Sequence, residues 1–310
     1  MWLIYALLAA VCFGFRGVLY HWASKQGLER NLMLLGVFAG GAVLCLVPAL
    51  LLRQPWETTA LAGVLMGTFS FVANACIFKG FAVGKASLIA ILTGLPPVVV
   101  LLLAYVVWGE AINVWQLGAF ALIVAGILLV RYSNDLSLRN LQGAQWGLLA
   151  MLFFGFNDMA GKLSTRLEAE LFPTLVCMFV TGCLWFGGSW LLDLRRARSR
   201  RMRAPAADAV LGEASSDSAN PAPARRWTPR RTFFTGMLIG TTNAVGMIVI
   251  INAFAVGITG LVSAVVALNV LIILLYSRVV LKERFGRLEI GGMATAIVGL
   301  VLLRLFELVA

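Results

Sequence analysis

Charged residues are scarce in this chain of 310 residues, of which 13% are Asp, Glu, Lys or Arg and 61% are hydrophobic. A soluble domain is about half apolar and about a quarter charged. The mean hydropathy of +0.92 is too high for a water-facing globule, so lipid must be the solvent for most of the chain. In lipid, backbone polar groups need internal hydrogen bonds, which leaves helices or closed barrels. The apolar runs are about 20 residues long and do not alternate, which predicts helices.

The chain has a single histidine, His21, which excludes a histidine-based metal site. Its five cysteines lie in apolar runs without CxxC spacing, so we expect them to pack as small hydrophobic side chains between helices. An HExxH motif, a GxSxG motif, a P-loop and a cluster of acids are also missing. We therefore expect no enzymatic activity, no cofactor and no metal, and any transport must run on gradients or exchange.

Basic residues outnumber acidic ones, with 25 Lys and Arg against 14 Asp and Glu and a formal net charge of +11. Most of this excess falls in segment 194–231 and near the ends of apolar runs, which is typical of membrane topology and predicts no nucleic-acid partner. Segment 194–231 is rich in Arg, Ala, Pro and Ser without an apolar period, which predicts a disordered loop. Such a basic loop beside a membrane can bind anionic lipid or partner proteins.

Apolar runs bounded by charged or turn residues predict an all-α integral membrane protein with ten transmembrane helices. The predicted spans are roughly 2–22, 32–52, 60–78, 86–107, 112–130, 145–163, 171–192, 233–254, 259–281 and 288–306. Glycines four residues apart predict close packing of the second, third and eighth spans against their neighbours. These glycines are Gly36 and Gly40, Gly63 and Gly67, and Gly236 and Gly240.

The chain also contains an internal repeat. Residues 81–131 align without a gap to residues 254–304, at an offset of 173, with 16 identities in 51 positions. Residues 13–24 align to residues 154–165 at an offset of 141, and the long loop accounts for the difference of 173 − 141 = 32. The sequence therefore predicts two five-helix halves, residues 1–131 and 145–306. Because five is odd, the second half must enter the membrane from the opposite side, and inverted repeats around a midplane site are typical of secondary transporters.

The distribution of basic residues predicts the orientation as well. With ten spans, the odd-numbered connections carry 20 Lys and Arg and the opposite side carries 4. Basic residues favour the cytoplasmic side, so we expect both termini outside and the 194–231 loop in the cytoplasm. The predicted location is a bacterial-type inner membrane, which the chain crosses several times.

Several of these residues resemble a known family. The run from Ala86 to Val130, with Pro97, the WGE that ends at Glu110 and the following GAFALIVAGILL, resembles an EamA-type domain. The second copy, through LKERFGRLEIGGMATAIVGLVLL, resembles the same domain again. Two such domains in tandem are similar to the ten-helix drug/metabolite transporter superfamily. The resemblance implies a central cavity between helices 1, 3, 4, 6, 8 and 9, and substrates such as amino acids, nucleotide sugars or choline.

The chain departs from this superfamily in two respects. Members are often described with cytoplasmic termini, which conflicts with the charge distribution found here. The four-helix small multidrug resistance relatives carry a glutamate in the middle of their first helix. Here residues 9–15 contain no acid, and Phe154 occupies the matching part of the sixth span. Cation–proton antiport through such a residue is therefore not supported.

Ionisable residues inside the predicted spans are the first candidates for substrate binding, since they are costly in hydrocarbon unless they face a wet cavity or a partner. Arg16 lies inside the first span and His21 near its end, whereas Asp158 and Lys162 lie in the sixth span. The repeat aligns Asn157 with Arg16 and Lys162 with His21. The two halves thus place polar groups at equivalent positions on opposite sides of the midplane.

These residues also have simpler interpretations. Asp158 and Lys162 are four residues apart on one helix face, so they can neutralise each other. The long side chain of Arg16 can extend to the headgroups; otherwise it is an anion-binding group suited to a carboxylate or phosphate. His21 can relay a proton, with Asp158 as its partner.

Uncharged polar residues within the spans complete the candidate site. Asn74, Asn243 and Asn269 either bind substrate or hydrogen-bond neighbouring helices. Asn269 occupies the repeat position of Pro96. The pair Pro96 and Pro97 should interrupt the fourth span near its middle, which frees carbonyl groups to bond neighbours or line a cavity.

The sequence therefore predicts a secondary transporter, an exporter or exchanger working by alternating access, as a monomer or homodimer. Arg16 and Lys162 favour a carboxylate or phosphate and Asp158 favours an amine, so the expected cargo is an amino acid, another zwitterion or an organic anion. Two alternatives stay open: a flippase for a lipid-linked substrate with the same fold, and a non-transporting scaffold whose basic loop binds partners. Deleting residues 196–226 would separate the scaffold from a carrier.

Overall fold

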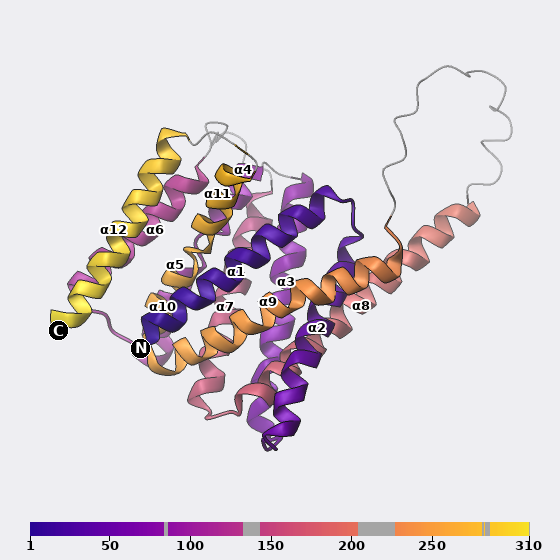
Figure 1. Cartoon of the computed structure of the whole chain (residues 1–310), viewed down its shortest axis with the longest axis horizontal. Coiled ribbons are helices and arrows are strands. Elements are labelled where there is room, and N and C mark those ends of the chain that lie inside the picture. The colour runs from indigo at the N-terminus through magenta and orange to yellow at the C-terminus, as the bar shows by residue number, and fades with distance from the viewer. Residues whose placement is uncertain (84–85, 133–142, 204–226, 281, 283–285, 310) are drawn as a thin grey trace.

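The computed structural model describes residues 1–83, 86–132, 143–203, 227–280, 282 and 286–309, and these ranges contain helices and connections but no strand (Figure 1). The helices of the first part are α1 (Trp2–Lys25), α2 (Arg30–Leu51), η1 (Thr58–Leu61), α3 (Ala62–Val83), α4 (Ala86–Leu92), α5 (Pro96–Trp108) and α6 (Val114–Arg131). Those of the second part are α7 (Ala144–Arg166), α8 (Leu171–Arg203), α9 (Pro229–Val256), α10 (Thr259–Val266), α11 (Asn269–Val279) and α12 (Arg287–Val309).

Each of the ten predicted spans corresponds to one helix or to two consecutive ones. Within the described ranges, nine helical segments are long and apolar enough to cross a membrane. The tenth, α7, has 23 residues but is not among the nine, because polar residues such as Asn157, Asp158 and Lys162 lower its hydropathy. The protein is thus an all-helical, multi-pass membrane protein. How the two halves are inverted in a bilayer stays a prediction.

Two of the spans are broken near their middle. The fourth span divides into α4 and α5, and α5 begins at the proline pair Pro96 and Pro97, as the sequence predicted. Proline lacks an N–H, so it fits the first turn of a helix and interrupts a continuous one. The ninth span divides into α10 and α11 at Ala267 and Leu268, directly before Asn269, without any proline. The prolines did not indicate this second break.

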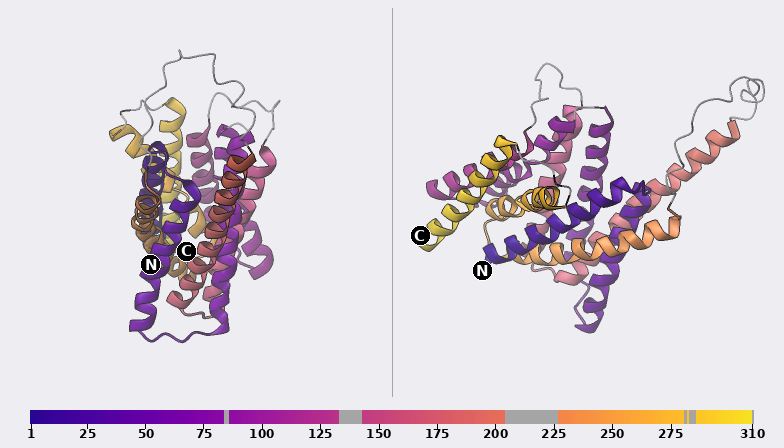
Figure 2. Two further views of the ribbon diagram at one scale, coloured as in Figure 1. Left: turned by 90° about the vertical axis from the view of Figure 1, so that its right-hand side faces the viewer. Right: turned by 45° about the horizontal axis from the view of Figure 1, so that its top comes forward.

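The boundaries predicted for the disordered basic loop are wrong at both ends. Helix α8 continues to Arg203, and α9 already begins at Pro229. Arginine and alanine favour helix, so the run that follows Asp193 extends α8 instead of ending it. The extension projects beyond the other helices (Figures 1 and 2). The rest of the predicted loop, residues 204–226, lies outside the described residues.

Glycines join three pairs of helices at backbone distance. A Cβ atom built on Gly36 of α2 would lie 2.2 Å from the carbonyl oxygen of Phe233 on α9, and one built on Gly236 would lie 2.2 Å from that of Met33. Gly63 of α3 faces the carbonyl oxygen of Thr174 on α8 in the same way, at 2.0 Å. Helices α6 and α12 also pack closely. The predicted close packing at these glycines is confirmed.

Large apolar side chains cover the outside of the helices. Val106, Leu184 and Leu238 are each more than two-thirds exposed, with exposed fractions of 77%, 72% and 71%. In water such a surface would drive aggregation, whereas in a bilayer it contacts acyl chains. The interior, by contrast, contains many small residues that allow the helices to approach.

Candidate functional site

A cavity of about 300 Å³ lies between helices of both halves. Its polar lining consists of Arg16 and Tyr20 of α1, Ser70 and Asn74 of α3, Thr93 before α5, Arg131 of α6, Asn157 and Asp158 of α7, Asn243 of α9, Ser263 of α10 and Asn269 of α11. Apolar side chains and the prolines that begin α5 complete it. Six of the eight predicted binding residues therefore line a single cavity, and two do not.

Arg16 points into this cavity and not toward the headgroups. Its guanidinium donates a hydrogen bond to Oδ1 of Asn243 on α9, and its Cζ lies 4.5 Å from the ring centroid of Phe13. The interpretation of Arg16 as a residue that extends to the membrane surface is wrong. An arginine held by an amide and an aromatic face keeps its positive charge uncompensated, which suits it to binding an anion.

Asp158 faces the cavity without Lys162 as its partner. Its Oδ2 accepts a hydrogen bond of 2.6 Å from the hydroxyl of Ser263 on α10. The proposed i,i+4 ion pair is wrong, since Lys162 points instead to Glu110. The neighbouring Asn157 has a buried Oδ1 that accepts no hydrogen bond from a described group. Asp158 and Asn157 thus offer acceptors on the α7 side of the cavity.

Arg131 is a cavity residue that sequence reasoning missed. Its Nη1 donates to the carbonyl oxygen of Ala90 at 2.7 Å and to Oγ1 of Thr93 at 2.9 Å, so it caps α4 at the break in the fourth span. Its Nε is buried and contacts no described acceptor. Arg131 directly follows the predicted span 112–130, so the sequence alone assigns it to the basic residues of the next connection. One signal could have found it. Helix α6 needs all of its 18 residues to span a membrane, so its last residue, Arg131, still lies within the span.

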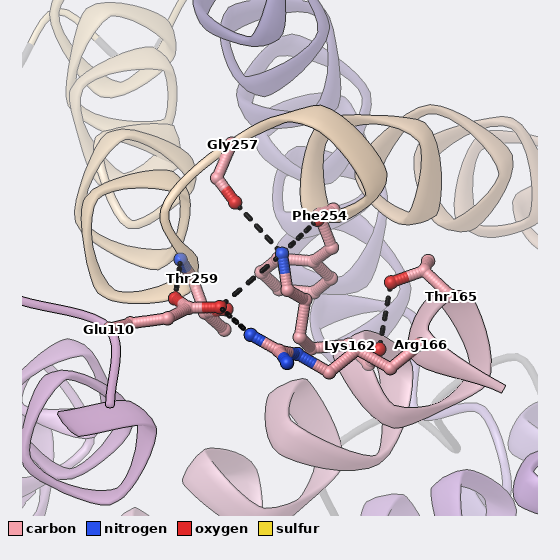
Figure 3. Close-up of polar contacts among 7 residues, drawn as sticks. All are labelled: Glu110, Lys162, Thr165, Arg166, Phe254, Gly257 and Thr259. Carbon is pink, nitrogen blue, oxygen red and sulfur yellow. Dashed lines mark hydrogen bonds and ion pairs between the residues drawn. The ribbon is translucent and has the colours of Figure 1, made fainter. Parts of the chain in front are cut away.

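Lys162 belongs to an ion cluster at one end of the helices, separate from the cavity lining (Figure 3). Its Nζ lies 3.4 Å from Oε1 of Glu110 and donates to the carbonyl oxygens of Phe254 at 2.5 Å and Gly257 at 3.0 Å. Arg166, one turn further along α7, also lies 3.4 Å from Oε1 of Glu110. We call Glu110, Lys162, Arg166 and Thr259 the Glu110 cluster.

Glu110 reaches this cluster from the short connection between α5 and α6. Gly109 ends α5 with φ 66°, a left-handed conformation that favours glycine, and so turns the chain toward α7 and α10. Oε2 of Glu110 then accepts a hydrogen bond of 2.8 Å from the N–H of Thr259 at the start of α10. Trp108 lies beneath Arg166, with 5.2 Å between the guanidinium carbon and the ring centroid. The WGE motif therefore joins the first half of the chain to the second.

Electrostatics favour the ionised form of this glutamate. Burial by itself would raise the pKa of Glu110, but the hydrogen bonds from Thr259 and the charges of Lys162 and Arg166 outweigh it and lower the pKa below its ordinary value of 4.5. The side chains of Glu110 and Lys162 are only 10% and 9% exposed, whereas that of Arg166 is 44% exposed. The Glu110–Lys162 pair is thus the buried centre of the cluster.

His21 lies away from the cavity lining. Its ring packs edge-on against Tyr276 of α11, with 6.3 Å between the ring centroids. The structure therefore gives no support to a direct proton relay between His21 and Asp158. The sequence had placed His21 and Lys162 together with Arg16 because all are ionisable groups within spans, and only the fold shows which of them face inward.

Comparison with a solved structure supports the fold. A solved structure titled only "Crystal structure of protein" resembles the chain with a TM-score of 0.67, at 13% sequence identity, over 98% of this chain and 98% of that one. At this identity the likeness concerns the fold alone. No curated protein matches the sequence of the chain.

The first part of the chain also matches a protein family. Residues 1–132, which supply Arg16, Asn74 and Arg131 to the cavity, match the EamA-like transporter family. The match does not extend to the second predicted domain, which stays a prediction from the internal repeat. The first 132 residues thus match an EamA-like transporter domain, and this match suggests a membrane transporter of the drug/metabolite type.

Proposed function

We propose that this protein is a secondary transporter that moves a small polar metabolite across the cytoplasmic membrane by alternating access, as an exporter or exchanger. The composition of the cavity carries the proposal. Residues at equivalent positions of the two halves line it in pairs. At a volume of about 300 Å³ it suits a small solute. Its two arginines, its aspartate and its amides suit a zwitterion or an organic anion.

The pairs follow from the two repeat offsets, with the offset of 173 extended back from residue 81 to residue 70. Seven of them have both members in the lining: Phe13 with Phe154, Arg16 with Asn157, Ser70 with Asn243, Asn74 with Met247, Ile77 with Ile250, Thr93 with Val266, and Pro96 with Asn269. A cavity at a pseudo-two-fold axis receives the same positions from each half. This is the place where transporters built from inverted repeats bind their substrates.

The helix contacts support the same symmetry. Helix α1 packs on α9 and its repeat equivalent α7 packs on α3, while α2 packs on α9 and its equivalent α8 packs on α3. The fifth and tenth spans, α6 and α12, pack on each other. Both spans broken beside the cavity, α4–α5 and α10–α11, also occupy equivalent positions, and broken helices of this kind are common at transporter binding sites.

Alternating access requires that one end of the cavity be closed while the other is open. The Glu110 cluster connects the loop after α5, the end of α7 and the connection between α9 and α10, which all belong to helices that line the cavity. We propose that this cluster holds its end closed. Under the predicted topology it is the outer end, because residues 109–113 lie on the same side as the termini.

Solute flux in proteoliposomes tests the proposal. Vesicles carrying the wild-type protein or Arg16→Ala would be loaded with a pooled metabolite mixture, and release would be measured by mass spectrometry. Arg304→Ala is the matched control, because Arg304 is exposed on α12 and does not line the cavity. We expect selective release of one chemical class by the wild type and by Arg304→Ala, and its loss in Arg16→Ala.

The opposite result would favour the alternatives. If folded wild-type protein released no solute selectively, with or without a pH gradient, the transporter proposal would be wrong. Flux that persists unchanged in Arg16→Ala would remove this cavity from the transport path. The polar lining already favours a soluble solute over the acyl chains of a lipid-linked one.

A further inference from the structure

Three residues of the cavity lining carry a formal charge: Arg16, Arg131 and Asp158. They come from helices α1, α6 and α7, so both halves of the chain contribute. Their charges add to +1 + 1 − 1 = +1. The lining therefore presents two cationic groups and one anionic group to whatever occupies the cavity.

None of these three groups has an ionic partner among the described residues, where both ion pairs involve Glu110. Arg16 binds the amide of Asn243, Arg131 binds the carbonyl of Ala90 and the hydroxyl of Thr93, and Asp158 accepts from the hydroxyl of Ser263. All of these partners are neutral. Each charge is thus held in position by hydrogen bonds while its Coulomb attraction stays available.

Charges within a membrane protein are stable when a counter-charge or water meets them. A solute that displaces the water must supply the missing counter-charges, because a buried charge left unpaired opposes its binding. Two arginines call for two acidic groups, and one aspartate calls for one ammonium group. The formal charge of such a solute is −1, opposite to that of the lining.

Two buried polar atoms of these lining residues also lack a hydrogen-bond partner among the described residues. Nε of Arg131 is a donor without a described acceptor, and Oδ1 of Asn157 is an acceptor without a described donor. The first suits an acidic oxygen of the solute. The second adjoins Asp158 in the sequence and suits an N–H of an ammonium group.

We infer, on the basis of the proposed function, that the transported solute is an acidic zwitterion with two carboxylate-type groups and one ammonium group. The acidic groups lie at Arg16 and Arg131, and the ammonium group lies at Asp158 and Asn157. A neutral amino acid leaves one arginine unpaired, and a dicarboxylate without an amine leaves Asp158 unpaired. Arg131 is in this arrangement a specificity-determining residue, and it also fixes the break between α4 and α5.

A matched set of solutes tests the inference directly. Proteoliposomes with the full-length protein would be loaded with equal amounts of glutamate and aspartate, their amides glutamine and asparagine, and the corresponding diacids without the amine, glutarate and succinate. We expect glutamate or aspartate to leave at least about tenfold faster than its amide and its diacid, since an unmatched charge opposes binding.

Variants that remove one charge from the lining should change which solute is transported fastest. Arg131→Gln should transport the amide faster than the acidic amino acid, and Asp158→Asn should favour the diacid. Arg304→Gln, at the repeat position of Arg131 but outside the lining, should retain the wild-type order. Arg131→Gln also removes the hydrogen bonds that cap α4 and can therefore fail to fold. The wild-type solute set and Asp158→Asn leave this cap intact, so they test the inference without Arg131→Gln.

The two proposals fail in different ways. Wild-type release of the amides or diacids at the rate of the acidic amino acids, or release of another charge class from the pooled mixture, overturns the inference and leaves the transporter proposal intact. An unchanged solute order in both variants also overturns it. Selective release of no solute at all, from folded protein, overturns both.

Discussion

Glu110 contacts three segments that are far apart in the sequence, and its substitution tests whether the cluster closes one end. Glu110→Gln keeps the hydrogen bond from Thr259 but loses both ion pairs. If this removes one or two kcal/mol from the closed state, the open fraction rises by roughly 5- to 30-fold.

Labelling of a cavity cysteine measures this change. The reporter is Phe154→Cys, a cavity position, in a background free of native cysteines. We expect a membrane-impermeant maleimide to modify this cysteine at least about fivefold faster when Glu110→Gln is also present than when Glu110 is intact. Glu57→Gln is the control, because Glu57 is exposed in a connection that the predicted topology places at the same end. Equal rates in the two variants would show that the cluster does not restrict access.

Lys162 and Arg166 contact the same carboxylate atom but differ in burial, which predicts different stabilities for their variants. Lys162→Met should destabilise the protein by about 3 kcal/mol, because it removes a buried charge from Glu110 and from two carbonyl oxygens. Arg166→Met should cost about 1 kcal/mol or less, since its side chain is 44% exposed. Thermal unfolding in detergent would check this order, and equal losses would contradict it.

The pH dependence of the Glu110 cluster follows from its lowered pKa. A carboxyl group whose pKa falls on folding stabilises the folded state above its ordinary pKa, and this contribution is lost as the pH falls through the lowered value. The stability difference between wild type and Glu110→Gln should therefore stay constant above about pH 5.5 and shrink below the ordinary value of 4.5. Unfolding temperatures of both proteins across this range would test it, and a difference that disappears near neutral pH would contradict it.

At the scale of helices, the glycine contact between α2 and α9 makes a sharp prediction. Gly36→Ala would place a methyl group 2.2 Å from the carbonyl oxygen of Phe233, so the two backbones must separate, at a cost of about 1 to 3 kcal/mol. Gly118→Ala, where nothing lies within 4 Å of the added atom, should instead stabilise α6 by about 0.5 to 1 kcal/mol. Opposite shifts in unfolding temperature are expected, and a tolerated Gly36→Ala would contradict this packing.

Helix positions were predictable from the sequence because each span has its own apolar run and its own ends. The break at Pro96 was predictable too, since proline acts locally. The break before Asn269 was not, because neither Ala267 nor Leu268 disfavours helix. The continuation of α8 to Arg203 was not predictable, because a basic run without an apolar period is typical of a disordered loop.

The sequence identified most residues of the candidate site but not their arrangement around one cavity. Polar residues within spans are rare, so Arg16, Asp158 and the asparagines were easily found. Which of them share a cavity depends on helix rotation, and the sequence does not determine that. Lys162 was placed in the substrate path because its partner Glu110 is 52 residues away (162 − 110 = 52), and Arg131 was missed because it ends its helix.

At the scale of the whole molecule, the predicted orientation can be tested by labelling. Single cysteines at exposed Glu57, between α2 and η1, and at exposed Arg198, on the extension of α8, should lie on opposite sides of the membrane. In intact cells, an impermeant reagent should modify Glu57→Cys and spare Arg198→Cys until the membrane is opened. The reverse pattern would place the termini in the cytoplasm, as is often described for the superfamily.

Helix α7 combines the polar residues of the cavity with an apolar content too low for it to count among the nine membrane-crossing segments. A nascent helix of this kind partitions poorly from the translocon into lipid on its own. Helix α3, on which α7 packs, precedes α7 in the chain and is therefore already synthesised when α7 emerges, so α7 can pack against it. We therefore expect the amino-terminal half to act as an assembly template: a fragment starting at Ala144 should integrate efficiently only when residues 1–132 are produced in the same cell.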